Sequence, residues 1–154
     1  MIDCTFVIDP VSWDDPDAVR LRDAQRTELD ARYGTDNHEP GEVPTADTVP
    51  VFLVARDADG TAIGCGGLRL LEPGSGEIKR MYVAPSSRGT GVATALLRAL
   101  EDHARRLGLT RLMLETGTGQ PDAIRFYQRE GYEPIEAYGP YVGETISRCF
   151  ARDL

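Results

Sequence analysis

The sequence predicts an α/β protein of the α+β kind, in which helices flank a mixed, mostly antiparallel central sheet of about six or seven strands. Three strand-like segments at 50–56, 61–71 and 77–83 are separated by short glycine-containing turns, and such a succession forms an antiparallel meander. An amphipathic helix follows, and then another apolar segment at 109–116. A strand, a helix and a strand in that order make a right-handed crossover, so the two strands are expected to be parallel.

The N-terminal third is expected to contain a short strand, one helix and a long loop. Residues 4–9 alternate in polarity, which favours a first strand. Asp15 can cap the following helix, Pro16 suits its first position, and Gly34 can end it. Residues 35–49 are rich in Pro, Gly, Asp and Glu without a period. They predict a long loop, a kind of segment that often lines a binding site.

The C-terminal half alternates helices and strands. The helix that begins near Gly91 carries Leu and Ala side chains at helical spacing, and Gly108 can end it. Residues 121–130 predict a second, shorter helix, which a glycine follows. Segments 132–135 and 145–151 are expected to be the two final strands, which complete the sheet.

Length and charge limit the classes of function. The 154 residues fit one domain spanning 1–154. Asp and Glu number 25 against 17 Lys and Arg, so the net charge is −8, whereas a nucleic-acid-binding protein needs a basic face. No apolar run approaches the roughly 20 residues of a membrane span, and residues 1–5 do not resemble a signal peptide. We therefore expect a cytoplasmic protein that binds neither nucleic acid nor membranes.

The cysteines indicate neither a disulfide framework nor a metal site. Cys4, Cys65 and Cys149 are odd in number, far apart and without C-x-x-C spacing. We therefore expect no metal ion, and a reducing compartment is the simplest setting. For Cys65 we favour a small buried side chain over a nucleophilic thiol.

A glycine loop joins the third meander strand to the long helix and reads Arg88-Gly89-Thr90-Gly91-Val92-Ala93. Its two glycines let the backbone turn sharply and approach a ligand closely. The first amides of a helix have no intrahelical partners and carry partial positive charge, which suits a phosphate group. The sequence therefore predicts a phosphate-bearing ligand at the start of this helix.

Two common nucleotide-binding loops do not fit this segment. A Walker A loop requires Gly-Lys-Ser or Gly-Lys-Thr after four intervening residues, and the chain has no such run. A Rossmann fingerprint requires a third glycine, but Thr94 stands at that position and an antiparallel meander precedes the loop. A glycine loop that only turns the chain is the structural alternative.

The loop instead matches the pattern (Gln/Arg)-x-x-Gly-x-(Gly/Ala), and it resembles the pyrophosphate loop of the GCN5-related N-acetyltransferase (GNAT) family. The strand Glu-Ile-Lys-Arg-Met-Tyr-Val at 77–83 precedes it. A second signature at 120–132, Gln-x-x-Ala-x-x-Phe-Tyr-x-x-x-Gly-Tyr, resembles the family's Asn-x-x-Ala-x-x-Phe-Tyr-x-x-x-Gly-Phe. The resemblance covers about residues 50–135. It implies acetyl-CoA as the co-substrate and a GNAT acyl-CoA N-acyltransferase fold, with a fourth strand at 77–83 that splays from a fifth at 110–116.

The resemblance also implies which residues hold acetyl-CoA. Backbone groups of Met81 and Val83 would pair with the pantetheine amides as an added strand does. An amide near Met81 would polarise the thioester carbonyl, and the amides of the glycine loop would hold the pyrophosphate. Gln120 replaces the family's Asn and keeps an amide group. The residues expected at the co-substrate are Met81, Tyr82, Val83, Arg88, Gly89, Thr90, Gly91, Val92, Ala93, Thr94, Gln120 and Tyr127.

Tyr127 resembles the family's general acid. The leaving thiolate has an ordinary pKa of about 8.5, and a phenol with a pKa of about 10 can supply a proton or a hydrogen bond to it. The attacking amine must lose a proton, and the resemblance makes Glu77 the first candidate for the base. Glu115, at the end of the neighbouring strand, is the second candidate. Either carboxylate could instead be structural, and His38 and His103 are expected at the surface.

The acceptor is expected where the first helix, the loop after it and the last strands meet. The expected lining residues are Arg32, Tyr33, Glu39, Glu42, Arg69, Tyr138 and Tyr141. Glu39 and Glu42 would suit a cationic amine, whereas Arg69 would suit one that carries a carboxylate. We predict an N-acetyltransferase that moves an acetyl group from acetyl-CoA to a primary amine of a small molecule or peptide, as a monomer or homodimer. The alternative is a non-catalytic acyl-CoA-binding regulatory module.

Overall fold

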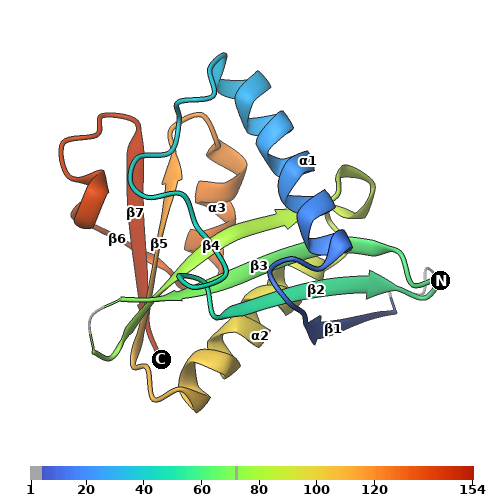
Figure 1. The fold of residues 1–154 in the computed structure, drawn as a ribbon. Coiled ribbons are helices and arrows are strands. Elements are labelled where there is room, and N and C mark those ends of the chain that lie inside the picture. Colours follow the sequence, from blue (N-terminus) through green and yellow to red (C-terminus); the bar gives the residue numbers. More distant parts are fainter. Residues whose placement is uncertain (1–4, 72) are drawn as a thin grey trace.

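Seven strands form one sheet in the order β1-β2-β3-β4-β5-β7-β6 (Figure 1). The computed structural model describes residues 5–71 and 73–154, so Cys4 of the predicted first strand and Glu72 of a predicted turn lie outside the described residues. The strands are β1 (Phe6–Pro10), β2 (Val51–Asp57), β3 (Ala62–Leu70), β4 (Ser75–Val83), β5 (Arg111–Gly117), β6 (Glu133–Ile135) and β7 (Ser147–Asp153). The β4–β5 pair is parallel and all other neighbouring pairs are antiparallel. The predicted mixed, mostly antiparallel sheet is confirmed.

Three α-helices flank this sheet: α1 (Pro16–Tyr33), α2 (Val92–Arg106) and α3 (Pro121–Arg129). The Asp15 carboxylate accepts hydrogen bonds from the amides at the start of α1, and Gly34 ends the helix with φ 69°, as the sequence predicts. Two 3-10 helices, η1 (Pro85–Ser87) and η2 (Gly139–Tyr141), were not predicted, because three residues are too few for a periodic signal. None of the helices in the described part of the chain is both long and apolar enough to span a bilayer.

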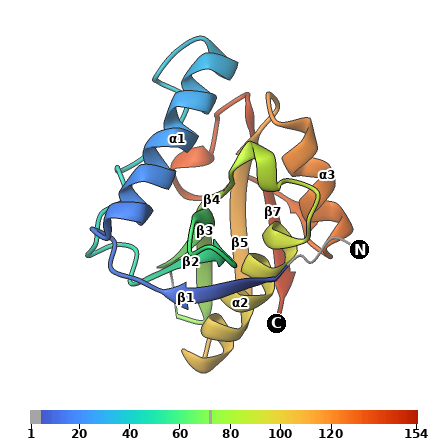
Figure 2. The same ribbon diagram turned by 90° about the vertical axis from the view of Figure 1, so that its right-hand side faces the viewer.

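The two faces of the sheet carry separate apolar clusters. Figure 2 shows α1 and α2 on opposite sides of the sheet. Successive β2 residues alternate between the faces: Phe52 and Val54 pack with α1, whereas Leu53 and Ala55 pack with α2. This alternation follows from the two-residue period of a strand. Helix α3 adds its apolar side chains to the α2 side.

The parallel strands β4 and β5 pair only at their N-terminal ends. Their register runs from Ser75 opposite Arg111 to Glu77 opposite Met113 and stops there. Strand β4 also carries a bulge, because two residues, Arg80 and Met81, stand opposite a single residue of β3. Arg80 has φ 58°, a backbone conformation that non-glycine residues seldom adopt, and a bulge bends its strand. The predicted splay of the fourth and fifth strands is therefore confirmed.

Candidate active site

A cleft of about 620 Å³ opens where β4 and β5 separate. It is bounded by the C-terminal half of α1, the end of β4, the glycine loop and α3. Its lining residues are Gln25, Glu28, Leu29, Arg32, Met81, Tyr82, Val83, Ser87, Arg88, Gly89, Gly91, Ala93, Thr94, Asp122, Ala123, Arg125, Phe126, Tyr127 and Arg129. Most of the residues that the sequence assigns to the co-substrate therefore lie along one cleft.

The glycine loop at the cleft has the backbone conformation that the sequence predicts. Gly89 has φ 77° and Gly91 has φ 92°, and Gly91 is the N-cap of α2. The Val92 side chain is buried in the core, so only its backbone can face a ligand. The Thr94 hydroxyl donates to Glu130 Oε1 at 3.0 Å.

The Arg88 side chain fastens the loop to two other walls of the cleft. Its Nε donates to the Val83 carbonyl at 2.9 Å. Its Nη2 donates to both carboxylate oxygens of Glu28 on α1, at 2.8 and 3.0 Å. The guanidinium thus links β4, the loop and α1.

A second, smaller cavity of about 80 Å³ lies beside the cleft. It is lined by Gln25, Leu29, Tyr33, His38, Glu39, Ile78, Lys79, Arg80, Met81, Leu114, Glu115, Thr116, Gly117, Gln120 and Tyr127. Gln25, Leu29, Met81 and Tyr127 line both spaces. Side chains from both faces of the sheet meet here, because the sheet is open between β4 and β5 at this point.

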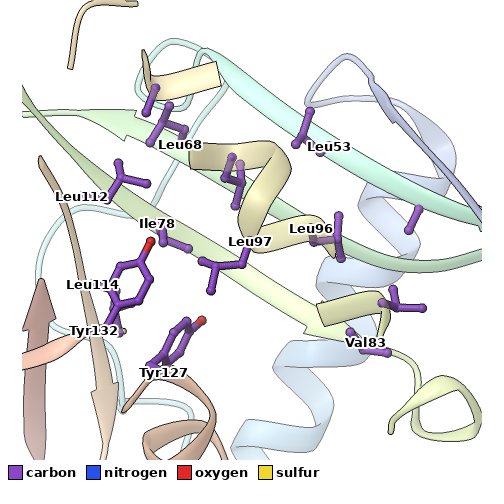
Figure 3. Packing of buried hydrophobic residues seen from close by; sticks show 14 of the residues in the cluster. Leu53, Leu68, Ile78, Val83, Leu96, Leu97, Leu112, Leu114, Tyr127 and Tyr132 are labelled. Atoms are coloured by element: carbon purple, nitrogen blue, oxygen red, sulfur yellow. The ribbon is translucent and has the colours of Figure 1, made fainter. Parts of the chain in front are cut away.

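Tyr127 is an almost fully buried side chain at the junction of the cleft and the cavity. Figure 3 shows it beside Leu97 and Leu114, between β4 and β5. Among the described residues, none forms a hydrogen bond with its hydroxyl. Burial raises the pKa of Tyr127 above its ordinary value, so the hydroxyl keeps its proton throughout the neutral range and can donate it to a group in the cleft.

Glu115 contributes a carboxylate to the second cavity. Its Oε2 accepts a hydrogen bond from Ser147 Oγ at 2.6 Å. Burial raises the pKa of Glu115 from its ordinary value of 4.5 to about 7, and the nearby carboxylates of Glu39 and Glu77 act in the same direction. A carboxylate that titrates near neutrality is suited to accept and release a proton under physiological conditions.

Glu77 lies elsewhere, in a buried cluster behind the cavity. Its side chain is 2% exposed, and its Oε2 accepts hydrogen bonds from the hydroxyls of Tyr138 and Tyr141 at 2.7 and 2.8 Å. Arg69 lies 3.9 Å from its other carboxylate oxygen. Neither Glu77 nor these three neighbours line the cleft or the cavity. The expected acceptor residues Arg69, Tyr138 and Tyr141 therefore surround Glu77 instead, and tie the loop before β7 to β4.

Cations and an anion line the cavity wall opposite β5. Lys79 Nζ donates to Glu39 Oε1 at 2.9 Å and to the Tyr141 hydroxyl at 3.2 Å. Arg80 Nη1 forms an ion pair with the other carboxylate oxygen of Glu39. Lys79 was not predicted as a site residue, although a strand period of two places it on the same face as Glu77.

One side of α1 faces the cleft, and of its residues the sequence predicted only Arg32 as a site residue. Gln25, Glu28, Leu29 and Arg32 follow helical spacing and therefore share one side of the helix. Gln25 Nε2 donates to the Met81 carbonyl at 2.9 Å, and its Oε1 is buried without a partner among the described residues. The weak apolar pattern of α1 was the available signal, because a helix that covers a site presents polar residues to it.

Several other predicted residues lie in different surroundings than expected. Gln120 lines the second cavity and donates to the Tyr33 hydroxyl at 3.2 Å, away from the glycine loop. The surface location expected for His38 is wrong, because its side chain is 4% exposed and its Nε2 lies 2.7 Å from Asp30 Oδ1. The loop that brings His38 back against α1 is not visible in a local sequence pattern.

Cys65 is buried, as the sequence predicts. Burial raises the pKa of its thiol to about 12, and Sγ donates to the Arg80 carbonyl at 3.3 Å, so it helps to hold the bulge and is not a nucleophile. Within the described residues, no three or more His, Cys, Asp or Glu side chains come together in a way that could hold a metal ion.

The sequence model of the acetyltransferase (GNAT) family matches residues 15–132, which include the cleft, the glycine loop and Tyr127. The chain belongs to the GNAT acetyltransferase family. The IAA acetyltransferase of Azospirillum brasilense is 43% identical over 104 residues, which cover 67% of each chain. An N-acetyltransferase of Schizosaccharomyces pombe is 36% identical over 57% of this GNAT chain and 55% of its own length.

Solved structures show the same GNAT fold. A Klebsiella pneumoniae protein described as an acyl-CoA N-acyltransferase has a TM-score of 0.83 and 35% identity, over 99% of each chain. A GNAT acetyltransferase of Elizabethkingia anophelis, solved with acetyl-CoA bound, has a TM-score of 0.71 and 17% identity, over 97% of this chain and 98% of its own. The whole described fold, including both strands at the cleft, is thus shared with known acetyltransferases.

Proposed function

We propose that this GNAT enzyme transfers an acetyl group from acetyl-CoA directly to the primary amine of a small molecule. One observation carries the proposal: the cleft from the glycine loop and the separate polar cavity meet at Tyr127, a buried side chain whose hydroxyl has no partner among the described residues. Such an arrangement lets two reactants approach one point from two directions, with a proton donor at that point. Direct transfer needs both reactants bound at once, which this geometry permits.

The donor would lie in the larger cleft. The backbone amides of Arg88 to Ala93 would bind the pyrophosphate, because they begin α2 and include two glycines with positive φ. The pantetheine arm would lie along Met81 and Val83, in the space that β5 leaves beside β4. The acetyl-CoA bound in the E. anophelis relative supports this choice of donor.

The chemistry assigns the proton transfers to two side chains. Glu115 accepts a proton from the amine as the amine nitrogen bonds to the thioester carbonyl carbon. The carbon–sulfur bond then breaks, and Tyr127 donates its proton to the departing thiolate of CoA. A backbone amide near Met81 stabilises the oxyanion that forms between these two steps. We place Glu115 in the basic role ahead of Glu77, because Glu115 lines the cavity whereas Glu77 is held by two tyrosines behind it.

The test is an assay of thiol release from acetyl-CoA over a panel of primary amines, with mass spectrometry of the products. We expect an N-acetylated product and one equivalent of CoA thiol for each product molecule. Binding of CoA without turnover of any amine would overturn the proposal and favour a non-catalytic acyl-CoA-binding module. Thiol release without an acetylated amine would indicate simple hydrolysis of the thioester.

A further inference from the structure

The second cavity differs in charge from the surface of the protein. The chain as a whole carries a net charge of −8, which by itself favours a cationic partner. The cavity, however, brings Lys79 and Arg80 together, and a single carboxylate, Glu39, lies between them. The other carboxylate in the lining, Glu115, is partly neutral near pH 7 because burial raises its pKa to about 7. The two cations therefore outnumber Glu39, the carboxylate that they both contact.

The two cations also have hydrogen-bond donors to spare. A lysine ammonium has three donors and an arginine guanidinium has five. Lys79 uses two of its donors, on Glu39 and Tyr141, and its side chain is 8% exposed. Arg80 uses Nη1 on Glu39, and within the described residues its Nε and Nη2 have no partner. These unused donors can donate hydrogen bonds to a ligand in the cavity.

We propose that the acceptor is a small amine that also carries a carboxylate, bound with its carboxylate at Lys79 and Arg80 and its amine toward Glu115 and Tyr127. The inference rests on the proposed function, because it assigns the second cavity to the acceptor. A carboxylate between a lysine and an arginine forms charge-assisted hydrogen bonds, which are stronger than neutral ones. Gln25 Oε1 in the same lining has no partner in the described part of the chain and can accept a hydrogen bond from an amine N–H.

Other amine classes fit the cavity less well. A polyamine would place a second cation beside Lys79 and Arg80, and like charges brought together oppose binding. A large ring system does not fit, because the cavity measures about 80 Å³ whereas pockets for drug-sized ligands measure roughly 300–1,000 Å³. Arg69, to which the sequence analysis assigned the carboxylate, lies outside the cavity beside Glu77.

The experiment compares each amino acid with its own carboxamide, which keeps the shape and removes the charge. The common α-amino acids, β-alanine and γ-aminobutyrate are assayed as acceptors with saturating acetyl-CoA, and kcat/KM is expressed per neutral amine. For the preferred chain length, we expect the carboxylate form to exceed its carboxamide by about tenfold or more, as for a hydrogen bond between charged groups. Equal or faster reaction of the carboxamides would overturn the inference while leaving the proposed function intact.

The Lys79→Gln variant tests the residue assignment. The ratio of carboxylate to carboxamide kcat/KM should fall by about tenfold, mainly through the acceptor KM, with the KM for acetyl-CoA unchanged. Because the ratio is measured within one variant, a loss of folded protein cancels. Arg106→Gln, which removes an exposed cation from the end of α2, should leave the ratio as it is. An unchanged ratio in Lys79→Gln would overturn the inference. An absence of turnover by the wild-type enzyme with every amine would instead overturn the proposed function itself.

Discussion

At the scale of single residues, Tyr127 combines burial with an unused hydroxyl. A buried tyrosine hydroxyl normally has a hydrogen-bond partner, and the neighbouring Tyr132 has one, since its hydroxyl donates to Glu101 Oε2 at 2.8 Å. Tyr127 has none among the described residues, and it lines both the cleft and the cavity. A hydroxyl without a partner in the described structure, at the junction of the cleft and the cavity, is well placed to donate a proton to a ligand.

Replacing Tyr127 by Phe should therefore lower kcat by about a hundredfold or more, because the general acid is lost. The stability of the protein should change little, because the hydroxyl forms no hydrogen bond in the described structure. Steady-state kinetics with acetyl-CoA and one acceptor measures the first effect, and thermal unfolding measures the second.

Tyr132→Phe is the matched control, because it also removes one hydroxyl from a buried ring. It should lower the free energy of unfolding by roughly 1–3 kcal/mol, since the buried Glu101 loses a donor, and it should leave kcat unchanged. A Tyr127→Phe enzyme with the wild-type rate and pH profile would remove the general-acid assignment.

The raised pKa of Glu115 predicts that the reaction rate depends on pH. Its pKa is raised to about 7, and only the deprotonated carboxylate can act as a base, so kcat/KM should rise as the pH passes through about 7. When kcat/KM is expressed per neutral amine, Glu115→Gln should lower it and abolish this rise. One acceptor is used for both proteins, so that the ionisation of the amine cancels in the comparison. Loss of the rise in Glu77→Gln but not in Glu115→Gln would reverse the assignment of the base.

The raised pKa of Glu115 also makes the stability of the protein depend on pH. Stability should fall as the pH rises, whereas kcat/KM should increase. The folded protein keeps a proton on Glu115 between pH 4.5 and about 7, where the unfolded chain has lost it. The stabilisation from this proton is therefore present in full below pH 4.5 and is lost as the pH rises through about 7. Relative to the wild type, Glu115→Gln should gain roughly 3 kcal/mol of stability between pH 4 and pH 8. Denaturant unfolding at both pH values measures the difference.

At the scale of elements, α2 has a glycine with positive φ at each end. Gly91 (φ 92°) begins the helix at the cleft, and Gly108 (φ 80°) follows its other end. A Cβ atom added at either position would meet no other atom within 4 Å. The two positions therefore differ in location and function but share the same backbone requirement.

Alanine at Gly91 should weaken CoA binding by about tenfold or more, because it disturbs the amides that begin the helix. Each of the two alanine substitutions should lower the free energy of unfolding by about 1 kcal/mol. Gly108→Ala should, however, leave the affinity for CoA unchanged. Calorimetric titration of CoA into both variants measures the difference. Equal affinities in the two variants would contradict a phosphate site at the start of α2.

At the scale of the whole molecule, the cleft joins parts of the chain that lie far apart in the sequence. Its walls come from α1, β4, the glycine loop and α3, and Arg88 already links α1 to the loop through Glu28. A ligand that contacts all four walls binds the folded state and not the unfolded chain, so it should stabilise the entire fold.

CoA at about 100 times its Kd should add about 2.7 kcal/mol to the free energy of unfolding. For a chain of this size, that corresponds to a rise in Tm of roughly 5–10 °C. Pantetheine lacks the pyrophosphate. At the same concentration as CoA, it should therefore produce a much smaller rise in Tm. Equal shifts with the two compounds would argue against binding of the pyrophosphate by the glycine loop.

The elements of this fold could be predicted from local sequence, since each has a local physical cause. The caps Asp15 and Gly34, the strand at β2 and the glycine loop depend on a few residues each, and the structure has them where the sequence placed them. The short helices η1 and η2 and the bulge at Arg80 were not predicted, because they depend on how neighbouring segments pack.

Local sequence together with the family resemblance therefore determined the fold class, the acetyltransferase family and the residues that β4 and the glycine loop contribute to the cleft. Only the tertiary structure decided which carboxylate faces the second cavity. Glu77 and Glu115 both lie on strands at the splay, and their sequence patterns do not distinguish them. Tyr138 and Tyr141 reach Glu77 from 61 and 64 residues away, while the separation of β4 from β5 opens the cavity beside Glu115. The surroundings of Glu77 and of Glu115 therefore depend on strand pairing and on packing between distant segments. A short stretch of the chain does not encode either of these.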